Sequence, residues 1–258
     1  MGRVRGRRHK IVSGRHIFAV LIAVFAILGG YAAYRLITTE ADYSAAQHEY
    51  AALRLFSPSN SAPADSGENG NGSPNTPPEH ETMPDLSDIN PDYIGWIRVN
   101  GTDIDYPVVQ GADNTKYLNT TFTGERNPSG TIFMDADCVN GFDFFTILHG
   151  HNMRDGSMFA GLHAFRENRF RVDYNEVTIF TPNEQMLVYK IFAVKVSNIY
   201  DEVFNLPLKG LDEKVNYFSE FDFTRQDLRE NVDIMILATC TDGNRNERLL
   251  IFAARVRD

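Results

Sequence analysis

An apolar run with no charged side chain, placed directly after a basic leader, constrains this chain more than any other feature. The run IFAVLIAVFAILGGYAAY covers Ile17–Tyr34, and the basic residues before it are Arg3, Arg5, Arg7, Arg8, Lys10 and Arg15. Extended to Thr38, the run approaches the ~20 residues that a helix needs to span a bilayer core. Basic residues on its N-terminal side predict that this end is cytoplasmic and that the rest is exported.

A cleaved signal peptide is the main alternative for this segment, because Gly30 and Ala32 are small residues at plausible cleavage spacing. The apolar run exceeds the usual ~7–15-residue core of a signal peptide, which favours an uncleaved anchor. A buried helix of a soluble protein explains poorly why basic residues precede a run with no polar face. We therefore predict a cytoplasmic basic segment over residues 1–16 and a transmembrane signal-anchor helix over residues 17–38.

The charge of the remaining chain excludes one class of partner. The net charge is −9, and no acidic residue occurs before Glu40, so the part that follows the anchor is more acidic than the whole. Such a surface offers few cations to neutralise phosphates, and we expect no nucleic acid as a partner.

Residues 39–84 are predicted to connect the anchor to a folded body. Residues 40–56, EADYSAAQHEYAALRLF, are rich in Ala, Glu and Leu and predict a juxtamembrane helix. Ser57–Pro84 contains six of the eleven prolines and almost no large apolar side chain, which is typical of a flexible spacer. Such a spacer would let the body work at a distance from the bilayer.

From Asp85 onward the pattern is mainly β. Short runs of β-branched and aromatic residues alternate with turn formers, which predicts strands at Ile94–Val99, Ile104–Val109, Thr131–Met134, Phe144–Leu148, Glu176–Thr181, Met186–Val196, Val232–Thr239 and Leu249–Val256. Leu211–Phe221 has apolar residues at helical spacing, which predicts an amphipathic helix over the sheet. Many short strands with few helices favour a closed or nearly closed β-barrel with peripheral helices.

Cys240 stands at the end of a predicted strand, and Arg248 opens the next one. If these strands pair, the thiol and the guanidinium emerge at the same end of the sheet, as a nucleophile and an oxyanion-stabilising donor would. A buried cysteine and a surface arginine fit the same pattern. Because Cys138 and Cys240 are the only two cysteines of an exported chain, a disulfide is a further alternative.

Two histidines, His149 and His151, flank Gly150 after the predicted strand FFTIL. Histidine exchanges a proton with a thiol near neutral pH, so a Cys/His pair for acyl transfer is a consistent interpretation. A zinc site is a rival, but no third His or Cys lies at a convincing ligand spacing, and we expect no metal. The other histidines, His9, His16, His48, His80 and His163, look incidental to the chemistry.

The globular part resembles a class B sortase along nearly its whole length. The similar segments are INPDYIGWIRVNGTDIDYPVVQGADNTKYL (Ile89–Leu118), TIFMD (Thr131–Asp135), HGHNMRDGSMF (His149–Phe159) and ATCTD followed by Arg248, in family order. This resemblance implies a sortase-type β-barrel of about seven to eight strands over residues 85–258. It also implies a membrane-anchored transpeptidase, with no cofactor, that cleaves an Asn-Pro-x-Thr-Asn/Gly sorting signal of a surface protein after its threonine. The acyl group would pass through a Cys240 thioester to the amine of a lipid-linked peptidoglycan precursor outside the cell membrane.

The resemblance also assigns residues to roles. Catalytic roles fall on His151, Cys240 and Arg248, while His149 takes a structural role. Asp242 matches an aspartate that could orient the histidine, and Asn114, Leu118 and Thr239 match positions near the peptide. The family's usual Thr-Leu-x-Thr-Cys appears here with Ile236 in place of the first threonine, well back along the strand.

Three other functions stay open at this point. A class B-like pilus-assembly sortase would use a pilin lysine as the acceptor amine. A secreted cysteine peptidase would use water in place of the amine. A non-catalytic exported β-barrel binding module would join Cys138 and Cys240 in a disulfide.

Overall fold

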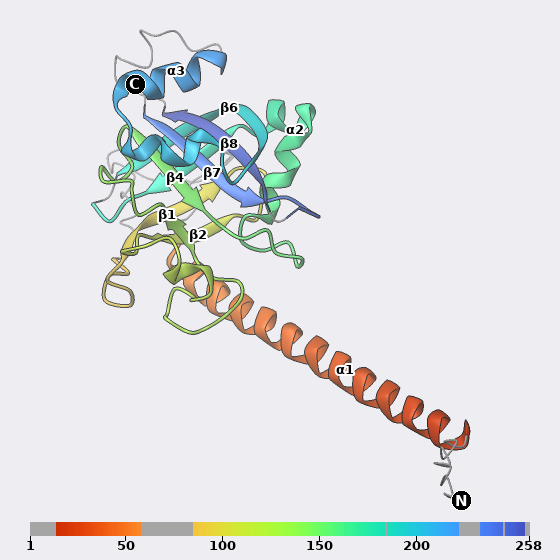
Figure 1. Ribbon diagram of the computed structural model, residues 1–258. Coiled ribbons are helices and arrows are strands. Elements are labelled where there is room, and N and C mark those ends of the chain that lie inside the picture. Colours follow the sequence, from red (N-terminus) through yellow and green to blue (C-terminus); the bar gives the residue numbers. More distant parts are fainter. Residues whose placement is uncertain (1–13, 58–84, 184, 222–232, 245, 256–258) are drawn as a thin grey trace, which may run out of the picture. The chain divides into compact units, whose positions relative to one another are not determined.

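The computed structural model describes residues 14–57, 85–183, 185–221, 233–244 and 246–255 (Figure 1). The chain divides into two compact units, residues 1–44 and residues 45–258. The basic residues before Gly14 and most of the expected spacer lie outside the described residues. The predicted boundaries after residues 16, 38 and 84 stay predictions.

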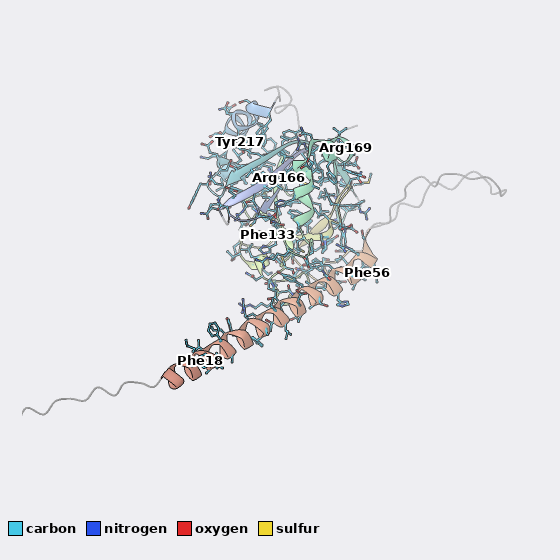
Figure 2. The ribbon with its side chains drawn as sticks, turned by 90° about the vertical axis from the view of Figure 1, so that its right-hand side faces the viewer. Phe18, Phe56, Phe133, Arg166, Arg169 and Tyr217 are labelled. Carbon is cyan, nitrogen blue, oxygen red and sulfur yellow. The ribbon has the colours of Figure 1, made fainter. Side chains whose placement is uncertain are left out.

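Helix α1 covers Gly14–Leu53 and therefore contains the whole expected anchor. The large apolar side chains that the structure describes from Phe18 to Ile37 are exposed, and Phe18 stands out from the helix in Figure 2. Leu21–Phe56 is long and apolar enough to cross a membrane, with a mean hydropathy of 1.7 in its most apolar window. Because the apolar residues of the first unit include Phe18, Phe25, Ile27, Tyr31 and Leu36, they surround the helix and do not form one stripe.

The second unit is an eight-stranded closed barrel, which confirms the predicted fold class. The strands are β1 (Tyr93–Val99), β2 (Asp105–Val109), β3 (Ile132–Met134), β4 (Phe145–His149), β5 (Glu176–Phe180), β6 (Met186–Asn198), β7 (Ile234–Cys240) and β8 (Glu247–Arg255). Their order around the barrel is β1-β2-β3-β4-β7-β8-β6-β5, and β5 closes it against β1. The pairs β2–β3 and β4–β7 are parallel, while the other pairs are antiparallel. Each of the predicted strands is present, with bounds that differ by a few residues.

The helix predicted at Leu211–Phe221 covers part of the barrel. It is α-helical over α3 (Leu211–Phe218) and continues as the 3₁₀ turn η5 (Ser219–Phe221). The Phe218 ring meets Phe252 of β8 edge to face, with 6.0 Å between the ring centroids, and also contacts Phe192 of β6. These aromatic contacts fix the helix on the sheet, because each such pair adds about 0.5–1.5 kcal/mol to the burial of its rings.

The remaining helical segments are short. They are the 3₁₀ helices η1 (Arg54–Phe56), η2 (Lys116–Leu118), η3 (Ala160–Arg166) and η4 (Glu202–Leu208), and the α-helix α2 (Asn168–Asp173). Leu162 and Phe165 of η3 are fully buried, so this segment is firmly packed. Together η2 and η3 bring two loops to the end of the barrel where β4 and β7 finish.

The C-terminal end of α1 packs on the barrel, a contact that the sequence pattern does not indicate. Ala46, Tyr50 and Leu53 are buried, and their spacing of four and three residues places them on one helical face. The Tyr50 hydroxyl donates to the carbonyl of Gly130, and its ring meets Tyr106 edge to face at 5.3 Å. Residues 45–57 therefore lie in the same compact unit as the barrel.

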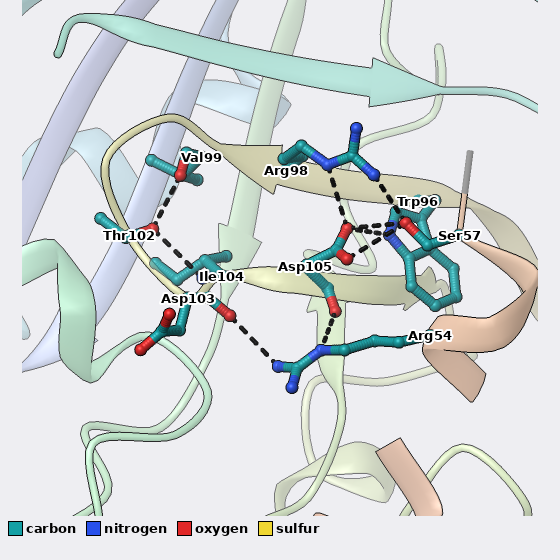
Figure 3. Close-up of polar contacts among 9 residues, drawn as sticks. All are labelled: Arg54, Ser57, Trp96, Arg98, Val99, Thr102, Asp103, Ile104 and Asp105. Carbon is teal, nitrogen blue, oxygen red and sulfur yellow. Dashed lines mark hydrogen bonds and ion pairs between the residues drawn. The ribbon is translucent and has the colours of Figure 1, made fainter. Parts of the chain in front are cut away.

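A polar network fastens the end of this helix to β1 and β2 (Figure 3). Arg54 donates from Nε to the carbonyl of Asp105 and from Nη2 to the carbonyl of Asp103, both at 3.1 Å. The Asp105 carboxylate accepts from Trp96 Nε1 at 2.7 Å and from the Ser57 hydroxyl at 3.0 Å. Arg98 joins the network through an ion pair with Asp105 at 3.3 Å.

Candidate active site

Cys240 and Arg248 lie side by side at one end of the barrel. Cys240 is the last residue of β7, Arg248 is the second residue of β8, and the two are partners in the antiparallel register. Residues Ile234–Thr239 of β7 are buried, whereas Cys240 is half-buried, so the strand is fixed along its length and open at its end. This arrangement agrees with the predicted pairing and brings the thiol-bearing and guanidinium-bearing residues together.

His151 follows the neighbouring strand on the other side of β7. Strands β4 and β7 run parallel, with His149 opposite Ala238, and the Gly150 amide donates to the Ala238 carbonyl at 3.2 Å. Two residues further on, the chain reaches His151 on one side and Cys240 on the other. The residues predicted to be catalytic thus come from the ends of three adjacent strands, β4, β7 and β8.

The His151 ring is fixed by the backbone of Leu118. Its Nε2 atom lies 2.7 Å from the Leu118 carbonyl oxygen, and a carbonyl oxygen can only accept a hydrogen bond. Nε2 therefore carries a proton, and in the neutral ring Nδ1 is the nitrogen left to accept one. Leu118, which is expected near the peptide, therefore also contacts His151 through its own carbonyl oxygen.

His149 has different surroundings from His151. Its Nε2 lies 2.8 Å from the Asp135 carboxylate, and its ring stacks near Phe204 and Phe133. Asp135 is 4% exposed. Burial raises the pKa of its carboxyl, but the hydrogen bonds from His149, the Asp137 amide and Asn114 outweigh burial and hold the pKa below its usual value. These contacts support the structural role expected for His149.

Asn114 contributes to the same cluster. Its side-chain amide donates to Asp135 at 3.0 Å, and its oxygen accepts from the Ala136 amide at 2.8 Å. Both ends of the side chain are thus engaged within the protein, and its predicted contact with peptide stays a prediction. No group of three His, Cys, Asp or Glu side chains among the described residues could hold a metal ion.

Asp242 lies two residues beyond Cys240 and contacts the histidine loop. Its carboxylate accepts from the side-chain amide of Asn152 at 2.8 Å, and Asn152 directly follows His151. This bond ties the loop after β7 to the loop after β4. Any orienting effect of Asp242 on His151 would pass through Asn152, and the proposed role stays a prediction.

Thr239 differs from the other predicted residues because it is only 2% exposed, and its hydroxyl finds no partner within the described part of the chain. Neighbouring residues of a strand point to opposite faces, so its side chain points away from that of Cys240. An effect of Thr239 on the peptide would therefore be indirect.

Both cysteines are free, so the disulfide of the binding-module alternative is not formed. Cys138 is buried, and its sulfur accepts from the Ile147 amide at 3.4 Å. Burial raises the pKa of the Cys138 thiol to about 12, which keeps it protonated near neutral pH. Cys240 is left as the thiol at an accessible strand end.

His163, expected from the sequence to be incidental, contacts the main chain of the site. Its Nε2 lies 3.1 Å from the carbonyl oxygen of Cys240, although 77 residues separate the two in the chain. Its place in η3, between the buried Leu162 and the half-buried Ala164, gives no periodic signal of such a contact. Only the fold reveals the pairing.

The comparisons with known proteins agree with this geometry. The family model described as the sortase domain matches residues 97–256. Sortase B of Listeria monocytogenes is 42% identical over 93 residues, which cover 36% of this chain and 38% of that protein, less than two thirds of its length. Sortase B of Staphylococcus aureus is 27% identical over 181 residues, covering 67% of this chain and 73% of that protein.

The fold comparison gives the same answer. A solved structure of a mutant form of Clostridium perfringens sortase B is 29% identical, with a TM-score of 0.67, and the match covers 82% of this chain and 98% of that one. The family model spans more than half of the sequence, and the eight-stranded barrel is shared. The chain therefore belongs to the sortase family, and within that family to class B.

Proposed function

We propose that this protein is a membrane-anchored cysteine transpeptidase that cleaves an Asn-Pro-x-Thr-Asn/Gly sorting signal after its threonine. The observation that carries the proposal is the meeting of three strand ends, which bring together Cys240, Arg248 and the loop of His151. A thiol, a proton acceptor and a permanent cation at one rigid edge are the groups that acyl transfer through a thioester requires.

In the first half-reaction, His151 accepts the Cys240 proton at Nδ1, and the thiolate attacks the threonine carbonyl carbon. Arg248 stabilises the negative charge that develops on the carbonyl oxygen, which its rigid fork of donors suits. The peptide bond then breaks, and the leaving amine takes the proton from His151. The threonine acyl group remains on sulfur as a thioester.

In the second half-reaction, an amine attacks the thioester, His151 takes the proton that the amine releases, and Cys240 leaves as thiolate before that proton returns to it. We propose the amine of a lipid-linked peptidoglycan precursor as the acceptor. A pilin lysine would complete the same chemistry, and water would complete hydrolysis. The acceptor decides whether the product is wall-anchored, polymerised or merely cleaved.

The N-terminal helix supports a location at the membrane. Its apolar side chains from Leu21 to Ile37 are exposed, a surface that fits lipid better than water. Because basic residues precede this helix, we propose a single membrane span with a cytoplasmic N-terminus and an extracellular barrel, in a cell of the Gram-positive type.

Mass spectrometry of the full chain in detergent tests the reaction. Incubation with a sorting peptide alone should add the mass of the acyl fragment to the protein, and an added amine should convert it to a transpeptidation product. Three acceptors should be compared: a wall-type peptide amine, a lysine-containing peptide and water. Whichever amine gives product over hydrolysis identifies the acceptor class.

Matched variants assign the nucleophile. Cys240→Ala and His151→Ala should form no thioester, whereas Cys138→Ala should form it as the wild type does, because Cys138 is buried away from solvent. A thioester on Cys138, or turnover by Cys240→Ala, would refute the assignment.

A further inference from the structure

The hydrogen-bond ladder between β4 and β7 ends just before Cys240. In a parallel pair, every second carbonyl along a strand accepts from the same neighbour, and the Ala238 carbonyl accepts from the Gly150 amide. The next carbonyl on that side of β7 belongs to Cys240. By then the chain after β4 has turned away, because Asn152 forms a bridge with Met158 of its own loop.

The Cys240 carbonyl is instead bound by a side chain. His163 Nε2 lies 3.1 Å from this oxygen, so the imidazole takes the place of the donor that β4 no longer supplies. Since a carbonyl oxygen only accepts, Nε2 is protonated, and it can donate whether the ring is neutral or charged.

The segment that carries His163 is well fixed. Leu162 and Phe165 on either side of His163 are fully buried, and the Phe165 ring meets Phe170 of α2 edge to face at 5.0 Å. The imidazole therefore projects from a rigid segment, as a side chain that positions a neighbouring group requires.

We propose that His163 is a positioning residue for Cys240. By binding the carbonyl of Cys240, it fixes the last peptide unit of β7 and hence the direction in which the thiol points. The two histidines then have separate tasks: His151 exchanges a proton, and His163 holds the backbone of the nucleophile. This inference rests on the proposed role of Cys240.

The test compares variants that keep or lose the donor. His163→Gln offers an amide N–H at nearly the same reach, whereas His163→Phe keeps a ring without a donor, and His163→Met offers a flexible side chain without one. We expect kcat for thioester formation to fall about tenfold in His163→Phe and His163→Met, as the loss of one hydrogen bond allows. KM for the peptide should change little, and His163→Gln should recover most of the activity.

Melting temperatures separate positioning from folding. A purely structural role would make activity follow stability across all three variants, while positioning makes activity follow the donor at equal melting temperature. The inference is overturned if His163→Met or His163→Phe keeps kcat within twofold of wild type, if His163→Gln is as impaired as they are, or if only KM changes. Should one variant without a donor fail to fold, the other still decides.

The wild-type reaction distinguishes the two proposals. If the wild type forms no thioester, the proposed function fails. If it forms one on Cys240 and the variants without a donor are unimpaired, only the role of His163 fails. The rate of Cys240 alkylation by iodoacetamide, which needs no peptide, should fall in His163→Phe and recover in His163→Gln.

Discussion

The carbonyl oxygen of Leu118 lies 2.7 Å from Nε2 of His151. The main chain of one loop therefore keeps the imidazole proton on Nε2 of a histidine in another loop. This contact depends on the main chain that packs closely against the Leu118 carbonyl group. Gly130 lies there with φ +59°, and a Cβ at this position would stand 2.4 Å from the Tyr117 carbonyl oxygen and 2.9 Å from that of Leu118.

Gly130→Ala should therefore damage activity as well as stability. The methyl group would push the Leu118 carbonyl away, and a displacement of about 1 Å at a catalytic group can cost about a hundredfold in rate. The measurement is kcat for thioester formation beside the melting temperature. Gly124→Ala is the matched control, because Gly124 also has a positive φ (+94°) but nothing within 4 Å of the added Cβ.

The control should lose about 1–2 kcal/mol of stability from backbone strain and keep its kcat. Equal losses of kcat in the two variants would mean that strain, and not the Leu118 carbonyl, accounts for the effect.

Arg248→Lys should be severely impaired, although the positive charge is kept. A lysine ammonium cannot reproduce the planar fork of donors, and losing one oxyanion donor costs about 3–4 kcal/mol in the barrier, roughly a hundred- to a thousandfold in rate. Single-turnover acylation measures this step directly. Arg169→Lys, an exposed residue of α2, should act as the wild type does. Near-normal acylation by Arg248→Lys would remove Arg248 from the oxyanion role.

Asp135 should make stability depend on pH in the acid range. Its folded-state pKa is lowered, so its ionised form stabilises the protein above the unfolded pKa of about 3.9, and this contribution is lost as pH falls through the folded pKa. Urea unfolding between pH 3 and pH 5 should show stability falling with acid in the wild type. Asp135→Asn should be less stable at pH 6 and should show a shallower fall; parallel curves for the two proteins would contradict this.

The docked end of α1 should contribute to the stability of the barrel. Tyr50→Phe removes the bonds of its hydroxyl to Gly130 and Thr131, at a cost of about 0.5–1.5 kcal/mol, and Tyr50→Ala also removes a buried ring, at about 3–5 kcal/mol. Leu55→Ala is the control, because Leu55 is 86% exposed. Chemical unfolding of the full chain in detergent measures all three.

A chain that begins at residue 85 lacks this helix and should melt below one that begins at residue 45. Equal melting temperatures for these two chains would show that the helix end adds nothing to the barrel.

The strands were predictable because each carries its own local signal. Runs such as Ile94–Val99 combine β-branched residues with adjacent turn formers, and pairing them into a barrel leaves their bounds nearly unchanged. The closeness of Cys240 and Arg248 was also predictable, since a short turn joins two antiparallel neighbours. The pairing of β4 with β7 was harder to predict from the sequence, because a parallel pair joins segments that are far apart in the chain.

Other features had weaker signals or none. The spacing of Ala46, Tyr50 and Leu53 was visible in the sequence, but it does not say which surface would receive that face. His163 had no local signal at all, because its partner is a main-chain oxygen, and every residue has one. Contacts of this kind depend on where a strand loses its neighbour, which is a property of the folded barrel.

The docked end of α1 also joins two separate stretches of the described sequence into one unit. Ser57 and Asp85 both belong to the compact unit of residues 45–258, and the Ser57 hydroxyl bonds to the Asp105 carboxylate of β2. The contacts of Tyr50, Arg54 and Asp105, and not the covalent chain alone, therefore hold residues 45–57 on the barrel, so a proteolytic cut between Ser57 and Asp85 should leave them bound.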